Sequence, residues 1–269
     1  MISLQKRILI GFILCSTLIF SCGEGKTNSE QPSQSNSKDS LSFTAAQYPD
    51  SIQLQILLQE QKYNNGDTLG AYTNLKALIQ QFPNSHELLN AISALQLLQG
   101  DTLSAIASLL QSLSINQNQP DIEFELAFIE AARNNIIALE IANRMIVRYG
   151  ERDIQAKGHF VKGIYFANIS QYNQSIQEFD SAIIKNFTLI DAYVEKGIIQ
   201  LETGQASNTI NTLSKAIALD KNNADILFWL GKAYQQKKEF DLALLYFSET
   251  IKLDPSNQAA QQAINKLKK

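Results

Sequence analysis

The chain has 269 residues, of which 45% are hydrophobic and 18% charged, and its formal net charge is −3. This composition is sufficient for a sizeable folded body. The acidic balance argues against nucleic acid as a partner, because such binding needs a basic face and only the short tail of Lys266, Lys268 and Lys269 is basic.

A basic start and a short apolar run open the chain. Lys6 and Arg7 precede an apolar run of about 13 residues at positions 8–20, which is shorter than a membrane-spanning helix usually needs. This order is typical of an export signal, so we expect residues 1–21 to be a signal peptide. An ordinary signal peptide without lipidation, or an uncleaved anchor, is the alternative.

The apolar run ends in the sequence LIFSCG at residues 18–23. A small residue followed by Cys and Gly resembles the cleavage box of bacterial lipoproteins. The resemblance implies that Cys22 becomes the first residue of the mature chain and carries a lipid anchor. By analogy with lipoprotein sorting, Gly23 favours the outer membrane, because it is not an acid. Cys15 would leave with the signal, so the mature chain would contain no free thiol, disulfide or cysteine metal site.

Residues 22–49 are rich in Ser, Asn, Gln, Lys and Glu and have almost no apolar residue before Leu41. Such a segment cannot bury enough surface to offset the entropy that is lost on ordering. We therefore expect a flexible tether with a root-mean-square reach of roughly 25–30 Å. It would hold a folded body, residues 50–269, away from the membrane.

The rest of the chain repeats with a period of 34 residues. Residues 66–71 (GDTLGA) recur as residues 100–105 (GDTLSA). Two further columns have the same spacing: Gly163, Gly197 and Gly231, and Phe179, Leu213 and Phe247. A small residue is needed where the two helices of a hairpin approach closely, which predicts that the two columns face each other.

The clearest unit is residues 224–257, ADILFWLGKAYQQKKEFDLALLYFSETIKLDPSN. Its apolar residues follow the three-and-four spacing of two amphipathic helices, and Pro255 lies where the second helix must stop. The pattern L-G-x-x-Y, then A-x-x-x-F, then Pro resembles the tetratricopeptide repeat. The resemblance implies an all-α fold, a right-handed superhelical solenoid of helix–turn–helix repeats.

The period divides the folded body into about six repeats and about twelve helices. They are 52–85, 86–119, 120–155, 156–189, 190–223 and 224–257, and the third is degenerate and two residues longer. We expect residues 258–269 to form a polar capping helix, because the last apolar face of a solenoid has no neighbour. This helix should cover the side of Leu242, Leu245 and Phe247.

The sequence gives no sign of an enzyme, a cofactor or a metal site. The two histidines, His86 and His159, lie on first helices of repeats, where packing or surface roles are expected. Motifs for zinc proteases, serine hydrolases and phosphate loops are missing, and the carboxylates are scattered over solvated faces.

In the tetratricopeptide family, the first helix of each repeat lines an inner groove. Carried over column by column, this resemblance assigns the following groove residues: Phe160, Ile164, Val194, Ile198, Leu201, Phe228 and Lys232. We predict that this groove is apolar and binds an apolar or amphipathic protein segment. The alternatives are that the same side chains are core residues of the solenoid, or that they form a dimer contact.

The leading functional hypothesis is a lipid-anchored scaffold or assembly adaptor of the bacterial envelope, whose partner is another envelope protein. Its layout is similar to that of lipoproteins with tetratricopeptide repeats that assist outer-membrane protein insertion or pilus secretin assembly. Two alternatives stay open: a glycan-capture lipoprotein of a nutrient-uptake system, and a self-associating homo-oligomer. The tight spacing and the single Trp disfavour glycan capture.

Overall fold

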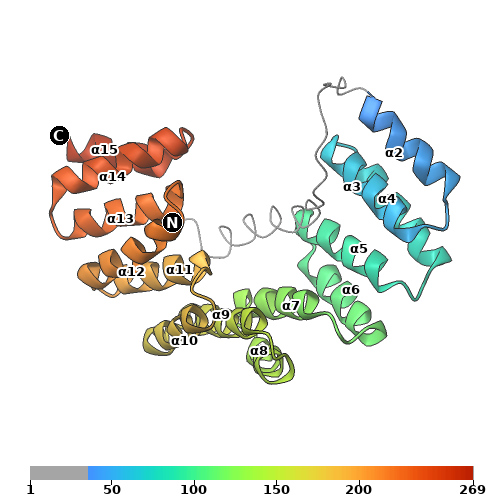
Figure 1. Cartoon of the computed structure of the whole chain (residues 1–269), viewed down its shortest axis with the longest axis horizontal. Helices are drawn as coiled ribbons and strands as arrows, with labels where there is room; N and C mark the ends of the chain where they lie inside the picture. The colour runs from blue at the N-terminus through green and yellow to red at the C-terminus, as the bar shows by residue number, and fades with distance from the viewer. Residues whose placement is uncertain (1–35, 269) are drawn as a thin grey trace, which may run out of the picture. The chain divides into compact units, whose positions relative to one another are not determined.

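A computed structural model describes residues 36–268, which form only helices and no strand (Figure 1). The predicted all-α fold is therefore confirmed. The helices are α2 (Asn36–Gln47), α3 (Ile52–Asn64), α4 (Thr68–Gln81), α5 (His86–Leu98), α6 (Thr102–Ile115), α7 (Pro120–Ala132), α8 (Ile137–Arg148), α9 (Arg152–Asn168), α10 (Tyr172–Lys185), α11 (Ile190–Glu202), α12 (Ala206–Leu219), α13 (Ala224–Gln236), α14 (Phe240–Leu253) and α15 (Gln258–Leu267).

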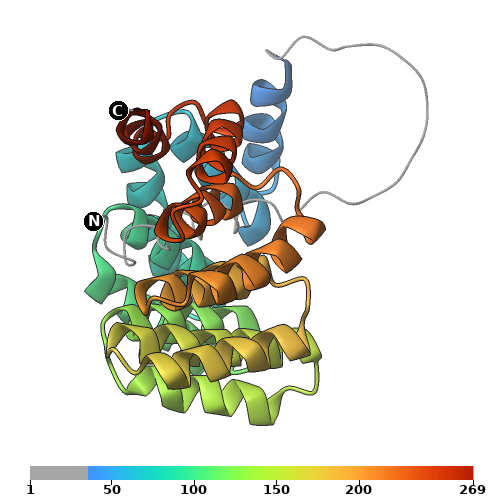
Figure 2. The same ribbon diagram turned by 90° about the vertical axis from the view of Figure 1, so that its left-hand side faces the viewer.

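The chain divides into two compact units, Met1–Ile122 and Glu123–Lys269, with the boundary inside α7. Within unit 1, α3 contacts α4, and α5 contacts α6. Within unit 2, α9, α11 and α13 each contact the helix that follows, and α10 and α12 contact the next hairpin in turn. Figure 2 shows this stacking for the yellow and orange helices of unit 2.

Each hairpin turn contains one residue with a left-handed backbone, which the chain needs in order to reverse direction. These residues are Gly66 (φ 93°), Gly100 (80°), Asn134 (59°), Ser170 (61°), Gly204 (81°) and Lys238 (64°). They are 34 residues apart, except that two extra residues separate Asn134 from Ser170. The insertion expected in the third repeat therefore lies between these turns, where α9 is extended to 17 residues.

The glycine and large-residue columns face each other, as the sequence predicts. A Cβ atom built on Gly163 would lie 2.5 Å from the Phe179 ring, and one on Gly231 would lie 2.7 Å from the Phe247 ring. In the repeat between them, a Cβ atom on Gly197 would lie 2.9 Å from Leu213. These spaces are too short for any side chain, so only glycine allows the two helices of these hairpins to pack this closely.

Hydroxyl groups join the same two helices at the level of these glycines. Ser175 Oγ donates to the Gly163 carbonyl oxygen at 2.8 Å, and Thr209 Oγ1 donates to the Gly197 carbonyl oxygen at 3.1 Å. Both hydroxyl-bearing residues are fully buried. Because their hydrogen bonds are made inside the hairpin, these polar groups lie in the core without the penalty of an unpaired buried group.

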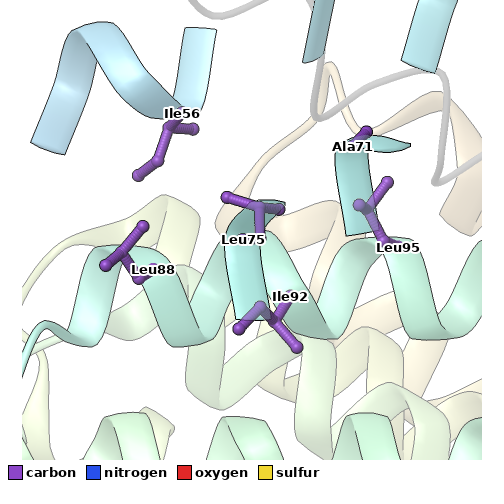
Figure 3. Close-up of a cluster of buried hydrophobic side chains, with 6 residues drawn as sticks. All are labelled: Ile56, Ala71, Leu75, Leu88, Ile92 and Leu95. Atoms are coloured by element: carbon purple, nitrogen blue, oxygen red, sulfur yellow. The ribbon is translucent and has the colours of Figure 1, made fainter. Parts of the chain in front are cut away.

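Unit 1 is held by apolar side chains from three consecutive helices, α3, α4 and α5 (Figure 3). The cluster consists of Ile56, Ala71, Leu75, Leu88, Ile92 and Leu95. In unit 1, the second helix of each of the hairpins α3–α4 and α5–α6 begins at an aspartate cap. Asp67 accepts a hydrogen bond from the Gly70 amide at 3.0 Å, and Asp101 accepts one from the Ser104 amide at 3.2 Å. These caps explain the recurring GDTL sequence, because they fix where α4 and α6 start.

Helix α2 lies within residues 22–49, which the sequence suggested to be a flexible tether throughout. Helix α2 contacts α3, Ala45 is almost completely buried, and Gln55 Nε2 donates to the Ala45 carbonyl oxygen at 2.9 Å. The expectation of flexibility is thus wrong for the end of this segment, because a short apolar patch is stabilised by packing on α3. Residues 22–35, like the signal segment, lie outside the described residues.

Helix α15 packs on α14 and closes the end of unit 2, as expected of a capping helix. Ala260 and Ile264 of α15 join Phe228, Ala243 and Phe247 in one buried cluster. The expected contact face was only partly right: Phe247 is covered, whereas Leu242 and Leu245 stay 39% and 52% exposed. The reason is that they lie on the side of α14 that faces away from this cluster.

The close helix approach gives a direct test of the fold. Gly163→Val places side-chain atoms where the Phe179 ring lies, so it should lower the free energy of unfolding by about 1–3 kcal/mol through overpacking. Gly150→Val is the matched control, because nothing lies within 4 Å of its added Cβ atom. Urea denaturation measures both, and equal stabilities of the two variants would contradict the close approach.

Candidate partner-binding face

The first helices of three hairpins in unit 2 lie next to each other. Helix α9 contacts α11, and α11 contacts α13. We call the side chains on these three helices that reach solvent the first-helix face. It contains the groove positions that the sequence assigned by resemblance, so it is the place to test that assignment.

Most of the assigned groove residues are core residues. Five of the seven are at least nine-tenths buried: Phe160, Ile164, Ile198, Leu201 and Phe228. Only Val194 and Lys232 are partly exposed. The expectation of an accessible apolar strip is therefore wrong for these five residues. Their side chains pack inside the solenoid, which was the alternative.

The packing partners show why these side chains are covered. The Phe160 ring lies 6.4 Å from the parallel Phe128 ring and 5.7 Å from the Phe179 ring, measured between centroids. At the other end of the unit, the Phe228 ring lies 5.8 Å from Phe247. The contact with Phe128 joins α9 to α7 of the preceding hairpin, whereas the contacts with Phe179 and Phe247 each join the two helices of one hairpin.

What the first-helix face presents to solvent is charged rather than apolar. Asp191 and Asp225 occupy the same column of successive repeats, and both are exposed in the first turn of their helices. Although Asp191 reaches solvent, the protein atoms packed around its carboxyl group partly desolvate it and raise its pKa, and the nearby carboxylate of Asp225 raises it further. Neither carboxylate is in an ion pair within the described part of the chain.

Two other charged clusters in unit 2 are used in packing. Glu178 of α10 accepts from His159 Nδ1 and pairs with Lys162 Nζ, both at 2.7 Å. Burial opposes the ionisation of Glu178, but these hydrogen bonds outweigh it and hold its pKa below the usual value. His159 thus joins the two helices of its hairpin, which agrees with a structural role.

The second cluster joins α7 to α8. The buried Glu123 carboxylate accepts from Arg144 Nε at 3.2 Å, and Arg148 Nη1 lies 3.5 Å from the same oxygen. Two cations compensate one buried carboxylate, which satisfies the requirement that a buried charge be paired. This cluster is best explained as a link between the two helices of the degenerate repeat.

Two open cavities lie at the hairpin turns rather than on the first-helix face. One of about 380 Å³ is lined mainly by polar side chains of residues 170–174, together with Ile176, Thr203 and Gln205. The other, of about 310 Å³, lies one repeat further along, between residues 204–208 and Gln236 and Lys237. Both result from the stacking of successive turns.

Across residues 36–268, no group of three or more His, Cys, Asp or Glu side chains is arranged to hold a metal ion. None of the helices in that part of the chain has the length and apolar character to cross a membrane.

Comparisons with known families agree with the geometry of the hairpins. A TPR repeat model matches residues 191–238, and a tetratricopeptide repeat model matches residues 224–257. The chain contains tetratricopeptide repeats. Proteins of this family are typically non-catalytic scaffolds for protein–protein interaction.

Solved structures of low sequence identity share the fold. A tetratricopeptide repeat protein from Parabacteroides merdae has a TM-score of 0.68 at 13% identity, with 98% of both chains covered. The type IV pilus biogenesis factor PilW has a TM-score of 0.66 at 14% identity, covering 79% of this chain and 97% of PilW. At these identities the likeness concerns the fold alone.

Among curated proteins, the peptidyl-prolyl cis-trans isomerase FKBP4 of Mus musculus is 30% identical over 111 residues. The match covers 38% of this chain and 24% of the isomerase, and the Rattus norvegicus protein matches equally. The chain thus corresponds to about a quarter of the length of these relatives, and the match covers only their tetratricopeptide region.

Glu125 of α7 gives unit 2 a pH dependence that can be measured. Burial raises the pKa of its carboxyl from 4.5 to about 7. The folded state binds the Glu125 proton more tightly than the unfolded state does. Protonation of Glu125 therefore contributes to the free energy of unfolding; the contribution is complete below pH 4.5 and is lost as the pH rises through 7. The difference corresponds to about 3 kcal/mol.

Glu125→Gln removes the titration and keeps a neutral side chain of similar size. The variant should be more stable than the parent at pH 8, and the two should converge near pH 4.5. Urea unfolding between pH 4.5 and 8 measures this, with Glu140→Gln, an exposed glutamate of α8, as the control. A parent and variant with the same slope against pH would contradict it.

Proposed function

We propose that this tetratricopeptide-repeat protein is a lipid-anchored scaffold or assembly adaptor of the bacterial envelope. It holds a segment of another envelope protein on the first-helix face of unit 2. The observation that carries the proposal is the pair of exposed carboxylates, Asp191 and Asp225, on adjacent first helices. They face solvent and have no ion-pair partner among residues 36–268, and they lie on the helices that line the groove in this family.

The structure revises the chemistry of the expected partner. Since the apolar groove columns are core, the accessible face offers two carboxylates together with the partly exposed Val194 and Lys232. The Asp225 carboxylate raises the pKa of Asp191, and such a pair of like charges favours a cationic group between them. A partner segment with Lys or Arg side chains beside an apolar residue fits this arrangement better than a wholly apolar segment.

The envelope location rests on the sequence, since Cys22 lies outside the described residues. The short apolar run and the Ser-Cys-Gly that follows it support export and lipid attachment. The likeness to PilW, a pilus biogenesis factor, supports the proposal only in that the two proteins share a fold. Glycan capture remains an alternative, and no side-chain arrangement within residues 36–268 favours it.

Lipid attachment can be tested in cells. Cys22→Ala removes the only residue that could carry the anchor in this reading, so the protein should move from the membrane fraction to the soluble envelope fraction. Cys15→Ala is the matched control and should fractionate like the parent. Membrane sedimentation of Cys22→Ala equal to that of the parent would overturn the anchor.

Partner capture tests the first-helix face. The double variant Asp191→Lys with Asp225→Lys reverses the charge of exposed positions, so it should keep its helix content and melting temperature. It should lower the recovery of membrane partners at least about tenfold, because like charges across an interface cost several kcal/mol. Crosslinking followed by affinity purification and mass spectrometry measures the recovery.

The control for this experiment is Asp241→Lys, which changes an exposed aspartate in the first turn of α14, a second helix. It should leave capture unchanged. If the double variant folds and recovers the same partners in the same amounts as the control, the first-helix face is not the binding site.

A further inference from the structure

Helix α6 in unit 1 has an outer face unlike that of any other second helix in the described chain. Its sequence, TLSAIASLLQSLSI, contains no ionisable side chain. Four exposed residues lie on one side of it at the helical spacing of four, three and four: Leu103, Ala107, Leu110 and Ser114. We call this row the α6 seam; Leu103 is 68% exposed and Leu110 is 53% exposed.

The other repeats show that apolar character is not required at this position. At the column of Leu110 they carry charged or hydroxyl residues: Lys76, Arg144, Asp180, Ser214 and Ser248. A solvent-facing column normally carries polar residues, so Leu110 is an exception at its column. Together with Leu103 and Ala107 it forms an exposed apolar row on one side of α6, which is typical of an interaction surface. Packing within the hairpin does not explain Leu110, since the side of α6 that meets α5 is formed by other residues.

The α6 seam is complementary to itself. In an antiparallel pair of α6 helices related by a twofold axis near residues 108 and 109, position 103 faces position 114 of the second copy, and position 107 faces position 110. Each contact then places a leucine against a small residue, Leu103 against Ser114 and Leu110 against Ala107. Alternating large and small residues let two helices interdigitate at close distance, and a twofold interface requires such reciprocal contacts.

The polar and charged groups are compatible with this pairing. Ser114 Oγ donates to the Gln111 carbonyl oxygen of its own helix at 2.7 Å, so covering it leaves no unpaired hydroxyl. The charged residues nearest to α6 in sequence, Asp101 and Asp121, lie beyond its two ends. In an antiparallel pair the two Asp101 carboxylates lie at opposite ends, so like charges do not meet.

We propose that two copies of the chain associate through the α6 seam as an antiparallel helix pair. A single helix pair buries an area at the low end of specific interfaces, so the dimer is weak and depends on concentration. The proposal is independent of partner binding on the first-helix face, because α6 belongs to unit 1 and the first-helix face to unit 2.

Sedimentation equilibrium of the full chain in density-matched detergent tests this association. The parent should show a monomer–dimer equilibrium, and Leu110→Glu should weaken it at least tenfold by placing a charge in the seam. Leu69→Glu is the matched control: Leu69 is 74% exposed and is the second residue of α4, as Leu103 is the second residue of α6. It should leave the association unchanged, and circular dichroism should show that both variants fold.

A second variant tests the antiparallel register. Ala107→Lys combined with Leu110→Glu places opposite charges across both central contacts of the pair, so it should recover association relative to Leu110→Glu alone. A parent that is monomeric at all concentrations overturns the proposal. So does equal weakening by Leu69→Glu and Leu110→Glu, or a combined variant that associates no better than Leu110→Glu.

Discussion

The close contact between a glycine on one helix and a large side chain on the next is the constraint on which the C-terminal hairpins depend. With Phe179, Leu213 or Phe247 seated against a bare Cα atom, the two helices lie too close for any other residue. This contact fixes the relative rotation of both helices, and therefore which columns become core and which reach solvent. Repetition of the contact every 34 residues makes successive hairpins stack in the same way.

The periodic features of this fold could be predicted from the sequence, because each results from contacts inside one repeat. The facing columns of Gly163 and Phe179 are of this kind, as is the end of the last repeat at Pro255. The left-handed turn column is periodic in geometry but not in residue type. Asn134, Ser170 and Lys238 have a left-handed backbone, as Gly66 has. The positions of these turns could therefore be predicted from the 34-residue spacing but not from the presence of glycine.

Features that depend on a neighbouring element were harder to predict. Helix α2 has a polar composition, and its few apolar residues matter only because α3 offers a surface for Ala45. Likewise, the sequence places Phe160 and Ile198 on first helices, but their exposure depends on how closely the next hairpin stacks. That distance is set by side-chain packing between repeats, which a pattern within one repeat does not contain.

The residues that give this solenoid a specific function should therefore be sought where the columns depart from the period. A column that is buried in most repeats, such as that of Leu75, Leu109, Phe179, Leu213 and Phe247, is constrained by packing and carries no information about partners. The pair Asp191 and Asp225 and the uncharged outer face of α6 are both solvent-facing, so the fold does not require their chemistry. The two carboxylates lie on adjacent first helices, and the uncharged residues of α6 lie in one row that can pair with the same row of a second copy. Such a grouping of similar side chains distinguishes a binding surface from ordinary solvated surface. Because the two surfaces belong to different units, association and partner capture can be separated by mutation.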